Sequence, residues 1–337
     1  MMMDAKLTGL KTLAIPFILA AASWPVHAND TSAVLGAGGL ELTTSEDIVM
    51  ASEDLYVSPS EVRVRYSFRN EADHDITTRV AFPLPDVDQS AYAIVFLPAP
   101  DQENFVDFHV AVDGERVRPQ LEQKAIADDG SDVTAELQKA GLPVNSHLPD
   151  WDEKARALPD NVWQHLVKEG LFDVEADDPN DRSADFSPSW SLSAAFHWEQ
   201  TFPAGKTITV DHRYKPIVGG VSSFEDEQQF DDYEAYCLDD QGKGGVRRLL
   251  KQARAAAHKD PDLAPGLAPI EVSYVLTTGA NWKGPIEKFH LTIDKEKPHA
   301  VLSLCMHGLK KTGPTTFELK QEDFTPKDDI RFVVFEG

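Results

Sequence analysis

The sequence is poor in cysteine and in basic side chains. Its two cysteines, Cys237 and Cys305, do not have the spacing of a Cys-x-x-Cys pair or a metal-ligand set, so dithiol redox catalysis and structural zinc have no motif. Only 32 lysines and arginines stand against 56 aspartates and glutamates, a formal net charge of −24. A surface this acidic repels phosphate backbones and anionic lipids. We therefore expect neither nucleic acid nor a membrane surface as a partner.

Long apolar runs are also missing, apart from one near the start of the chain. Two lysines and the apolar residues 12–22 precede Val26-His27-Ala28, which places small residues where a signal peptidase reads them. The run is too short to span a bilayer, and no other segment approaches the roughly 20 apolar residues required. No cysteine near the cut could carry a lipid anchor. We expect a signal peptide over residues 1–28, cleaved after Ala28, and a periplasmic or secreted mature chain beginning at Asn29.

Catalytic and metal motifs are equally scarce. The sequence has no Gly-x-Ser-x-Gly elbow, no His-Glu-x-x-His and no Walker-type phosphate loop. Asp185-Phe-Ser187-Pro-Ser189 has the letters of a metal-adhesion motif, but a polar loop replaces the strand that should position it. The acidic clusters lack the ligand order of a calcium hand, and solvated loops are the simpler interpretation. We assign no catalytic residue, no metal ligand and no cofactor.

A glycine-rich run, Gly242-Lys-Gly-Gly245, precedes a basic helical pattern and has the form of an anion cradle at a helix N-terminus. Asp239 and Asp240, immediately before it, would repel that anion. The simpler interpretation is that the basic helix face complements the acidic surface of the protein itself.

Alternating strands are the main feature of the mature chain. Val62, Val64, Tyr66 and Phe68 face one way while charged residues between them face the other, the period of a strand with one wet face. Similar runs continue to residue 125, which defines an N-terminal β-sandwich part over 29–125. A second such part spans 189–337. In it His212 falls on an apolar face, which favours a core histidine over a ligand.

Helical patterns are confined to two places. Residues 126–188 carry three short helical patterns followed by a proline-bearing acidic loop, and we interpret them as an insertion without its own core. Residues 246–258 form one amphipathic helix, apolar on one side and basic on the other. The predicted fold class is therefore mainly β: an antiparallel β-sandwich, or two, with a short helical insertion and one amphipathic helix.

Cys237 and Cys305 are expected to form a disulfide, because an exported protein with one cysteine pair usually oxidises it. The bridge would close a loop of about 68 residues and stabilise the fold by about 4 kcal/mol. The alternative is two buried thiols with Cα atoms well over 7 Å apart.

A candidate interaction surface rests on aromatic residues outside the regular strands. Trp282 lies in the turn Asn281-Trp-Lys-Gly-Pro285, where an exposed ring could stack on a sugar or anchor a partner. A turn-sealing core residue is the alternative interpretation. The full candidate surface consists of Trp282, Lys283, Trp163, Leu166 and Leu171.

Several segments resemble the bacterial exported family known as domain of unknown function 4424, among them WEQTFPAG at 198–205 and YVLTTGANWKGPI at 274–286. Further similar segments are 29–39, 62–66, 82–86, 236–240 and 311–318. The resemblance covers nearly the whole mature chain. It implies export and a β-rich fold, and it brings no activity and no assigned residues.

Residues 62–124 also resemble the N-terminal sandwich module of inter-alpha-trypsin inhibitor heavy chains, through Phe82-Pro-Leu-Pro85 and Val112-Asp-Gly114. That module serves interaction rather than catalysis. We therefore expect a non-catalytic protein that binds an unknown envelope protein or polymer. Two alternatives stay open: a hydrolase acting on an envelope polymer, which needs converging carboxylates in a groove, and a divalent-cation binder, which needs an oxygen cage.

Overall fold

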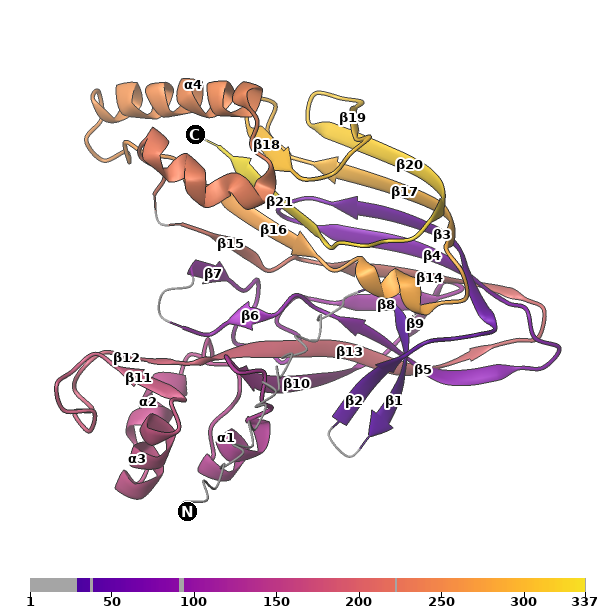
Figure 1. Ribbon diagram of the computed structural model, residues 1–337, viewed down its shortest axis with the longest axis horizontal. Helices are drawn as coiled ribbons and strands as arrows, with labels where there is room; N and C mark the ends of the chain where they lie inside the picture. Colours follow the sequence, from indigo (N-terminus) through magenta and orange to yellow (C-terminus); the bar gives the residue numbers. More distant parts are fainter. Residues whose placement is uncertain (1–28, 37–38, 91–93, 222, 337) are drawn as a thin grey trace, which may run out of the picture.

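The computed structural model describes residues 29–36, 39–90, 94–221 and 223–336. Strands dominate it, most of them paired antiparallel, and the α-helices gather at two ends (Figure 1). The mainly β fold class predicted from the alternating patterns is confirmed. The expected signal peptide, 1–28, lies outside the described residues.

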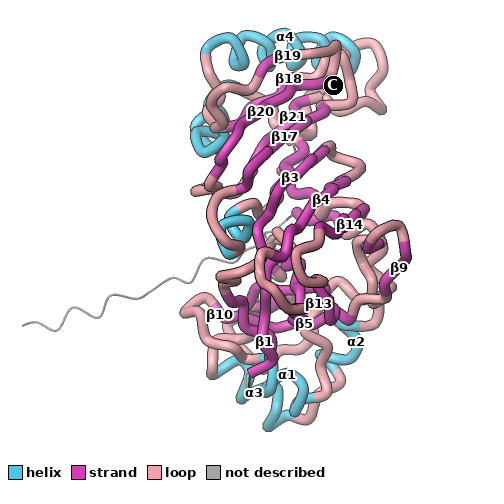
Figure 2. Tube along the Cα trace, turned by 90° about the vertical axis from the view of Figure 1, so that its right-hand side faces the viewer, coloured by secondary structure: helices cyan, strands magenta, loops and turns pink. Residues whose placement is uncertain are grey.

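The largest sheet has eight strands and carries the site described below. Figure 2 shows it running along the length of the molecule, with α4 at one end and α1 and α3 at the other. Its neighbours are antiparallel except β3 and β17, which pair in parallel. The strands in spatial order are β19 (Lys310–Lys311), β20 (Thr316–Phe324), β17 (Ile286–Asp294), β3 (Ile48–Val57), β4 (Val62–Asn70), β14 (Thr207–Tyr214), β8 (His109–Val112) and β9 (Glu115–Val117).

Two further large sheets accompany the eight-stranded sheet. One contains β10 (Gln120–Ala127), β13 (Trp190–Phe202), β5 (Ile76–Pro83), β1 (Thr31–Gly36) and β2 (Gly39–Thr43), with β6 (Val87–Asp88) beside β13. The other contains β18 (Val301–Leu304), β21 (Ile330–Phe335), β16 (Ile270–Tyr274), β15 (Val218–Gly220) and β7 (Ile94–Phe96). Each of the three sheets takes strands from both 29–125 and 189–337, so the two predicted sandwich parts share their sheets.

The main hydrophobic core lies along the inner faces of the sheets. On β4 the burial alternates as predicted, with Val62, Val64, Tyr66 and Phe68 buried. Side chains of the insertion belong to the same core. A second, smaller cluster lies beneath α4 and includes Phe335 from β21.

The insertion contains the three expected short helices, α1 (Thr134–Ala140), α2 (Trp151–Arg156) and α3 (Asp160–Lys168). Gly141 ends α1 in the left-handed conformation, φ 79°. The proline-bearing acidic loop expected at the end of the insertion is only partly a loop, because β12 (Phe186–Pro188) pairs there with β11 (Phe172–Val174). Phe186 packs against neighbouring aromatic rings of the insertion, which draws this segment into a strand.

The amphipathic helix is longer than the pattern predicted. It is α4 (Asp240–Ala257), preceded by the 3-10 helix η1 (Glu227–Tyr236), and the side chain of Asp239 caps it by accepting from the Gly242 amide at 2.7 Å. The glycine run 242–245 therefore lies inside the helix, and the interpretation as an anion cradle before it is wrong. Gly245 packs on β18 so closely that a Cβ there would meet Val301 Cγ2 at 2.7 Å.

The predicted disulfide is confirmed. Cys237 and Cys305 are bonded, with their Cα atoms 5.1 Å apart. The bridge joins the end of η1 to the residue that follows β18, so it ties the excursion that carries α4 back to the sheet.

Candidate functional site

The outer face of the eight-stranded sheet carries an unusual concentration of basic side chains. On β4 the strand period buries Val64 and Tyr66 and turns Arg63 and Arg65 outward. On β14 the same period buries His212 and turns Asp211 and Arg213 toward the outer face. Because β4 and β14 pair in register, Asp211 lies opposite Arg65. The two strands thus bring three guanidinium groups together.

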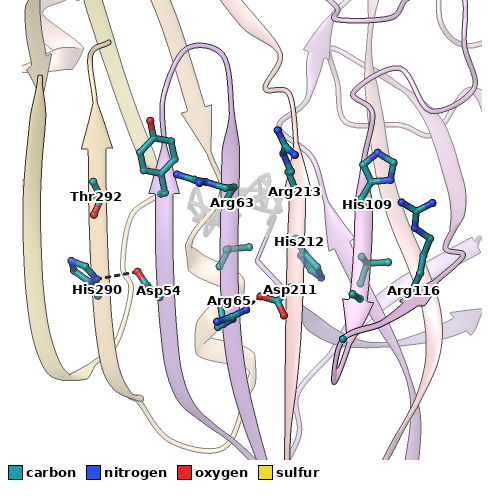
Figure 3. Close-up of a pocket in the computed structure, with 15 residues that line it drawn as sticks. Asp54, Arg63, Arg65, His109, Arg116, Asp211, His212, Arg213, His290 and Thr292 are labelled. Atoms are coloured by element: carbon teal, nitrogen blue, oxygen red, sulfur yellow. Dashed lines mark hydrogen bonds and ion pairs between the residues drawn. The ribbon is translucent and has the colours of Figure 1, made fainter. Parts of the chain in front are cut away.

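A depression of about 740 Å³ lies over this face, and Figure 3 shows the side chains that border it. We call it the arginine groove and define it by nine outward-facing residues. They are Asp54 on β3, Arg63 and Arg65 on β4, Asp211 and Arg213 on β14, His109 on β8, Arg116 on β9, and His290 and Thr292 on β17. Four arginines and two aspartates line the groove, and Glu61 and Glu318 contact lining residues from its border.

Carboxylates orient three of these arginines from one side only. Arg65 Nε lies 2.6 Å from Asp211, Arg213 Nε lies 2.5 Å from Glu61, and Arg63 Nε lies 3.2 Å from the other oxygen of Glu61. In every case the contact is made through Nε, and no hydrogen bond joins a terminal nitrogen of these three guanidinium groups to another described residue. The side chains of Arg63, Arg65 and Arg213 are 54–71% exposed. They are therefore positioned but still accessible.

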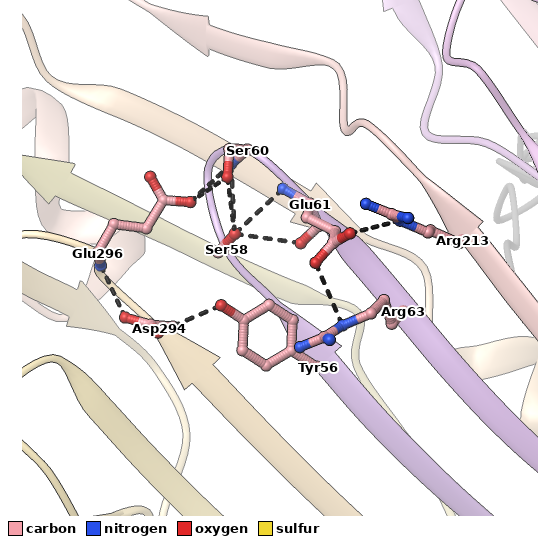
Figure 4. A network of polar contacts seen from close by, with 8 residues as sticks. All are labelled: Tyr56, Ser58, Ser60, Glu61, Arg63, Arg213, Asp294 and Glu296. Atoms are coloured by element: carbon pink, nitrogen blue, oxygen red, sulfur yellow. Dashed lines mark hydrogen bonds and ion pairs between the residues drawn. The ribbon is translucent and has the colours of Figure 1, made fainter.

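A polar network holds one end of the groove (Figure 4). The Arg63 guanidinium lies over the Tyr56 ring, 4.3 Å from its centroid, and the Tyr56 hydroxyl donates to Asp294 at 3.2 Å. Burial and the neighbouring Asp294 raise the pKa of Tyr56, which keeps this hydroxyl protonated. Beyond it, the Ser60 amide donates to Glu296 at 3.1 Å and fixes the β3–β4 turn. Arg63 thus has its position set by ring and carboxylate together.

His290 lies at the opposite side of the groove, between two carboxylates. Its Nδ1 is 3.0 Å from Asp54 and its Nε2 is 3.4 Å from Glu318. A catalytic histidine pairs with one carboxylate and turns its other nitrogen to a nucleophile. In this arrangement both nitrogens face carboxylates, so His290 serves to hold strands β3, β17 and β20 together rather than to activate a hydroxyl.

Arg116 is the least engaged cation of the groove. It lies on β9 at the edge of the sheet, and among the described residues no ion pair or hydrogen bond involves its side chain. Guanidinium groups bind carboxylate and phosphate oxygens through paired N–H groups. The groove as a whole can therefore hold an anionic group by several forks from neighbouring strands.

A model of the family described as domain of unknown function (DUF4424) matches residues 28–333. The chain belongs to this family. The resemblance noted in the sequence is thereby confirmed. No curated protein matches the chain.

Among solved structures, the DUF4424 chain is similar to one from Legionella pneumophila subsp. pneumophila str. Philadelphia 1 that is called a "putative nutrient binding protein". The TM-score is 0.44 at 14% sequence identity, over 92% of this chain and 70% of that one. A likeness this low carries no argument about ligand or fold.

The residues of the predicted interaction surface do not border the groove. Trp282, Trp163, Leu166 and Leu171 are buried, at 1–3% exposure, and only Lys283 is accessible. Trp282 seals the turn against Phe68 and Phe202, which is the alternative interpretation of that residue. Lys283 pairs with Glu71 at 2.9 Å. Contact of this surface with a partner stays a prediction, and the four buried side chains could contribute to it only through packing.

The other residues considered in the sequence as possible ligating side chains have structural positions. The predicted core position of His212 is confirmed, since the ring is buried among aromatic side chains. Ser187 of the metal-adhesion letters lies in β12. Over the described ranges, no three His, Cys, Asp or Glu side chains come together in a way that could hold a metal ion.

Sequence reasoning missed the arginine groove. Strand alternation did assign Arg63 and Arg65 to the wet face, and that was the available signal. It could not show that β14, β8 and β17 lie alongside, because strand order within a sheet is set by long-range pairing.

Proposed function

We propose that this protein is an exported, non-catalytic binding protein that uses the arginine groove to hold an anionic ligand or partner of the cell envelope. The observation that carries the proposal is the group of Arg63, Arg65 and Arg213, each tethered through Nε and, among the described residues, without a hydrogen bond on its terminal nitrogens. Such pre-positioned guanidinium groups lose little side-chain freedom on binding carboxylate, phosphate or sulfate oxygens.

The charge balance narrows the ligand. At a distance the net charge of −24 repels an anion, whereas within the groove the arginines attract it. The ligand should therefore be a compact anionic group that fits against the sheet, rather than a long polyanion that also covers the acidic surface. Salt screens the long-range repulsion and the short-range attraction alike. We expect binding to depend less steeply on salt than binding by a basic protein does.

Export is part of the same proposal. The leader pattern at residues 1–28 supports it, and so does the disulfide, because such bonds persist in oxidising compartments. In the described ranges no helix has both the length and the apolar character needed to cross a bilayer. N-terminal sequencing of the protein recovered from its host should find Asn29 as the first residue. An intact leader on most of the folded protein would refute this part of the proposal.

The groove is tested by titration with inorganic phosphate, citrate and an anionic oligosaccharide, followed calorimetrically at low and moderate salt. The variant Arg65→Gln with Arg213→Gln should bind the preferred probe at least tenfold more weakly. The matched control, Arg247→Gln with Arg254→Gln, makes the same charge change on the exposed face of α4. Equal affinity of the two double variants would show that overall charge, not the groove, governs binding.

No observation favours the two alternative functions. A hydrolase would need a nucleophile or a water-activating pair. Both nitrogens of His290 face carboxylates, and His109 pairs with Asp107 at 3.1 Å without a hydrogen bond to a hydroxyl group of the described residues. A cation site would need converging oxygens, and the acidic loops show Asx turns, in which Asp129 and Asp181 accept from nearby amides.

A further inference from the structure

A buried polar cluster lies directly beneath the arginine groove, on the inner face of the same strands. It combines Glu53 of β3, Tyr66 of β4 and His212 of β14 with Tyr274 of β16. Asp30, at the start of the described chain, also belongs to it. All five side chains are at most 3% exposed. The Tyr66 and Tyr274 hydroxyls lie 3.0 Å apart and hydrogen-bond to each other.

The carboxyl groups of this cluster lack the partners that a buried charge requires. Within the described chain neither side-chain oxygen of Asp30 has a hydrogen-bond partner, and Oε1 of Glu53 has none. Burial raises the pKa of both groups, that of Glu53 to about 8. His212 lies 3.5 Å from Asp30, but burial lowers its pKa to about 3, so it does not supply a positive charge near neutral pH. No lysine or arginine of the described residues forms an ion pair with Asp30 or Glu53.

The backbone nitrogen of Asn29 is the group best placed to supply a positive charge. Asn29 is fully buried, and its side-chain amide donates to Oε2 of Glu53 at 3.1 Å. Its backbone N–H donates to the hydroxyl of Thr278. Trp282 Nε1 donates to the Asp30 carbonyl at 2.6 Å and fixes the next residue. The first residue of the proposed mature chain is thus already held inside the molecule, with its side chain on Glu53 and its backbone nitrogen one residue before Asp30.

We propose that cleavage after Ala28 converts the nitrogen of Asn29 into an α-ammonium group that serves as the internal counter-ion of Asp30 and Glu53. This inference rests on the proposed export. Hydrolysis breaks the Ala28–Asn29 C–N bond, water supplies the oxygen of the new Ala28 carboxylate, and the released nitrogen takes up protons to become the ammonium. One ammonium between two carboxyl groups gives a neutral cluster when one carboxyl ionises and the other keeps its proton.

Leader removal would therefore complete the fold. Before cleavage the same nitrogen, at a fully buried residue, is an uncharged amide with one N–H. After cleavage it has three donors and a charge, and an α-amino group is ordinarily protonated near neutral pH. Since a buried charge is stable only when it is paired, ammonium and carboxylate depend on each other.

The test compares a chain beginning at Asn29 with one that keeps Ala28, each with and without Glu53→Gln. In the Asn29 chain we expect E53Q to reduce the folded-to-unfolded ratio at least tenfold, because it removes the partner of the ammonium. In the Ala28 chain we expect E53Q to be neutral or stabilising, because the carboxyl group there has no counter-ion. The control Glu71→Gln, at an exposed carboxylate paired with Lys283, should have the same effect in both chains.

A second measurement does not require the longer chain to fold. An amine-specific reagent should label the α-amine of the Asn29 chain at least 100-fold more slowly under native conditions than in urea. Native labelling as fast as in urea, or an equal effect of E53Q in the two chains, would overturn the inference. These outcomes are independent of export, which is decided by the first residue of the protein recovered from its host.

Discussion

Removing the disulfide should cost this protein a large part of its stability without disturbing its core. Cys237 and Cys305 are both exposed, so the double variant Cys237→Ser with Cys305→Ser leaves no buried cavity. The effect of the substitution is then almost entirely that of removing the cross-link. The measured loss of unfolding free energy can therefore be compared directly with the value from the chain-entropy model.

The magnitude follows from the loop that the bridge closes. The two cysteines are separated by 68 residues. In the chain-entropy model a loop of this length restricts the unfolded chain by about 4 kcal/mol at 25 °C. Native contacts at the same place remain in the variant, since the Ser303 hydroxyl still donates to the Tyr236 carbonyl at 2.8 Å. We therefore expect a folded variant that is less stable by about 4 kcal/mol.

Equilibrium unfolding in urea, followed by tryptophan fluorescence, measures the difference. Reduced wild-type protein should match the double variant, whereas Ser303→Ala, which removes only a neighbouring hydrogen bond, should lose about 1 kcal/mol. A loss below about 1 kcal/mol in the double variant would refute the entropic reasoning. It would mean that the unfolded chain already holds the two segments together.

Three further predictions concern the packing and titration of the core. Gly245→Ala should destabilise the protein by about 1–3 kcal/mol, because its Cβ would meet Val301 at 2.7 Å. Gly244→Ala, whose Cβ would have nothing within 4 Å, should stabilise α4 by up to about 1 kcal/mol. Thermal melts of both variants measure the difference, and equal shifts in melting temperature would contradict the reasoning. Burial lowers the pKa of His212 from 6.5 to about 3, so the stability contributed by its neutral ring is present above pH 6.5 and is lost as the pH falls toward 3, by at most about 1.4 kcal/mol per pH unit. Urea unfolding should therefore show less acid destabilisation in His212→Phe than in the wild type, and parallel pH profiles of the two proteins would contradict this. Trp282→Phe keeps an aromatic ring but leaves a buried carbonyl without its donor, so it should lose about 1–3 kcal/mol in the same assay, and an unchanged midpoint would show that the bond is dispensable.

The period of the sequence predicted local structure well where one face of a strand is buried. The side chains of β4 alternate as expected, because a strand with one wet face must repeat every two residues. Cysteine count and compartment likewise predicted the pairing of Cys237 with Cys305. Strand alternation depends on residues that are near in sequence, and two cysteines allow only one intramolecular pairing.

Features set by distant contacts could not be predicted in this way. The parallel pairing of β3 with β17 joins segments more than 200 residues apart, and it brings His290 beside Asp54. The start of α4 could not be predicted because the glycine run 242–245 suggested a loop. In the structure Asp239 caps the helix, which therefore begins before these glycines. Trp282 follows η2 (Thr277–Asn281) in a turn, where no period indicates burial; its two aromatic neighbours come from other strands.

The strand period also connects the two proposals. On β3 it turns Glu53 inward and Asp54 outward, and in the paired register these residues lie opposite Tyr66 and Arg65 of β4. The pair Glu53–Tyr66 belongs to the buried cluster and the pair Asp54–Arg65 to the arginine groove. A register slip of one residue would exchange the two sets. Neutralising the inner carboxyl groups therefore helps to hold the register that positions the outer guanidinium groups. On this reasoning, leader removal and ligand binding act on opposite faces of the same strands.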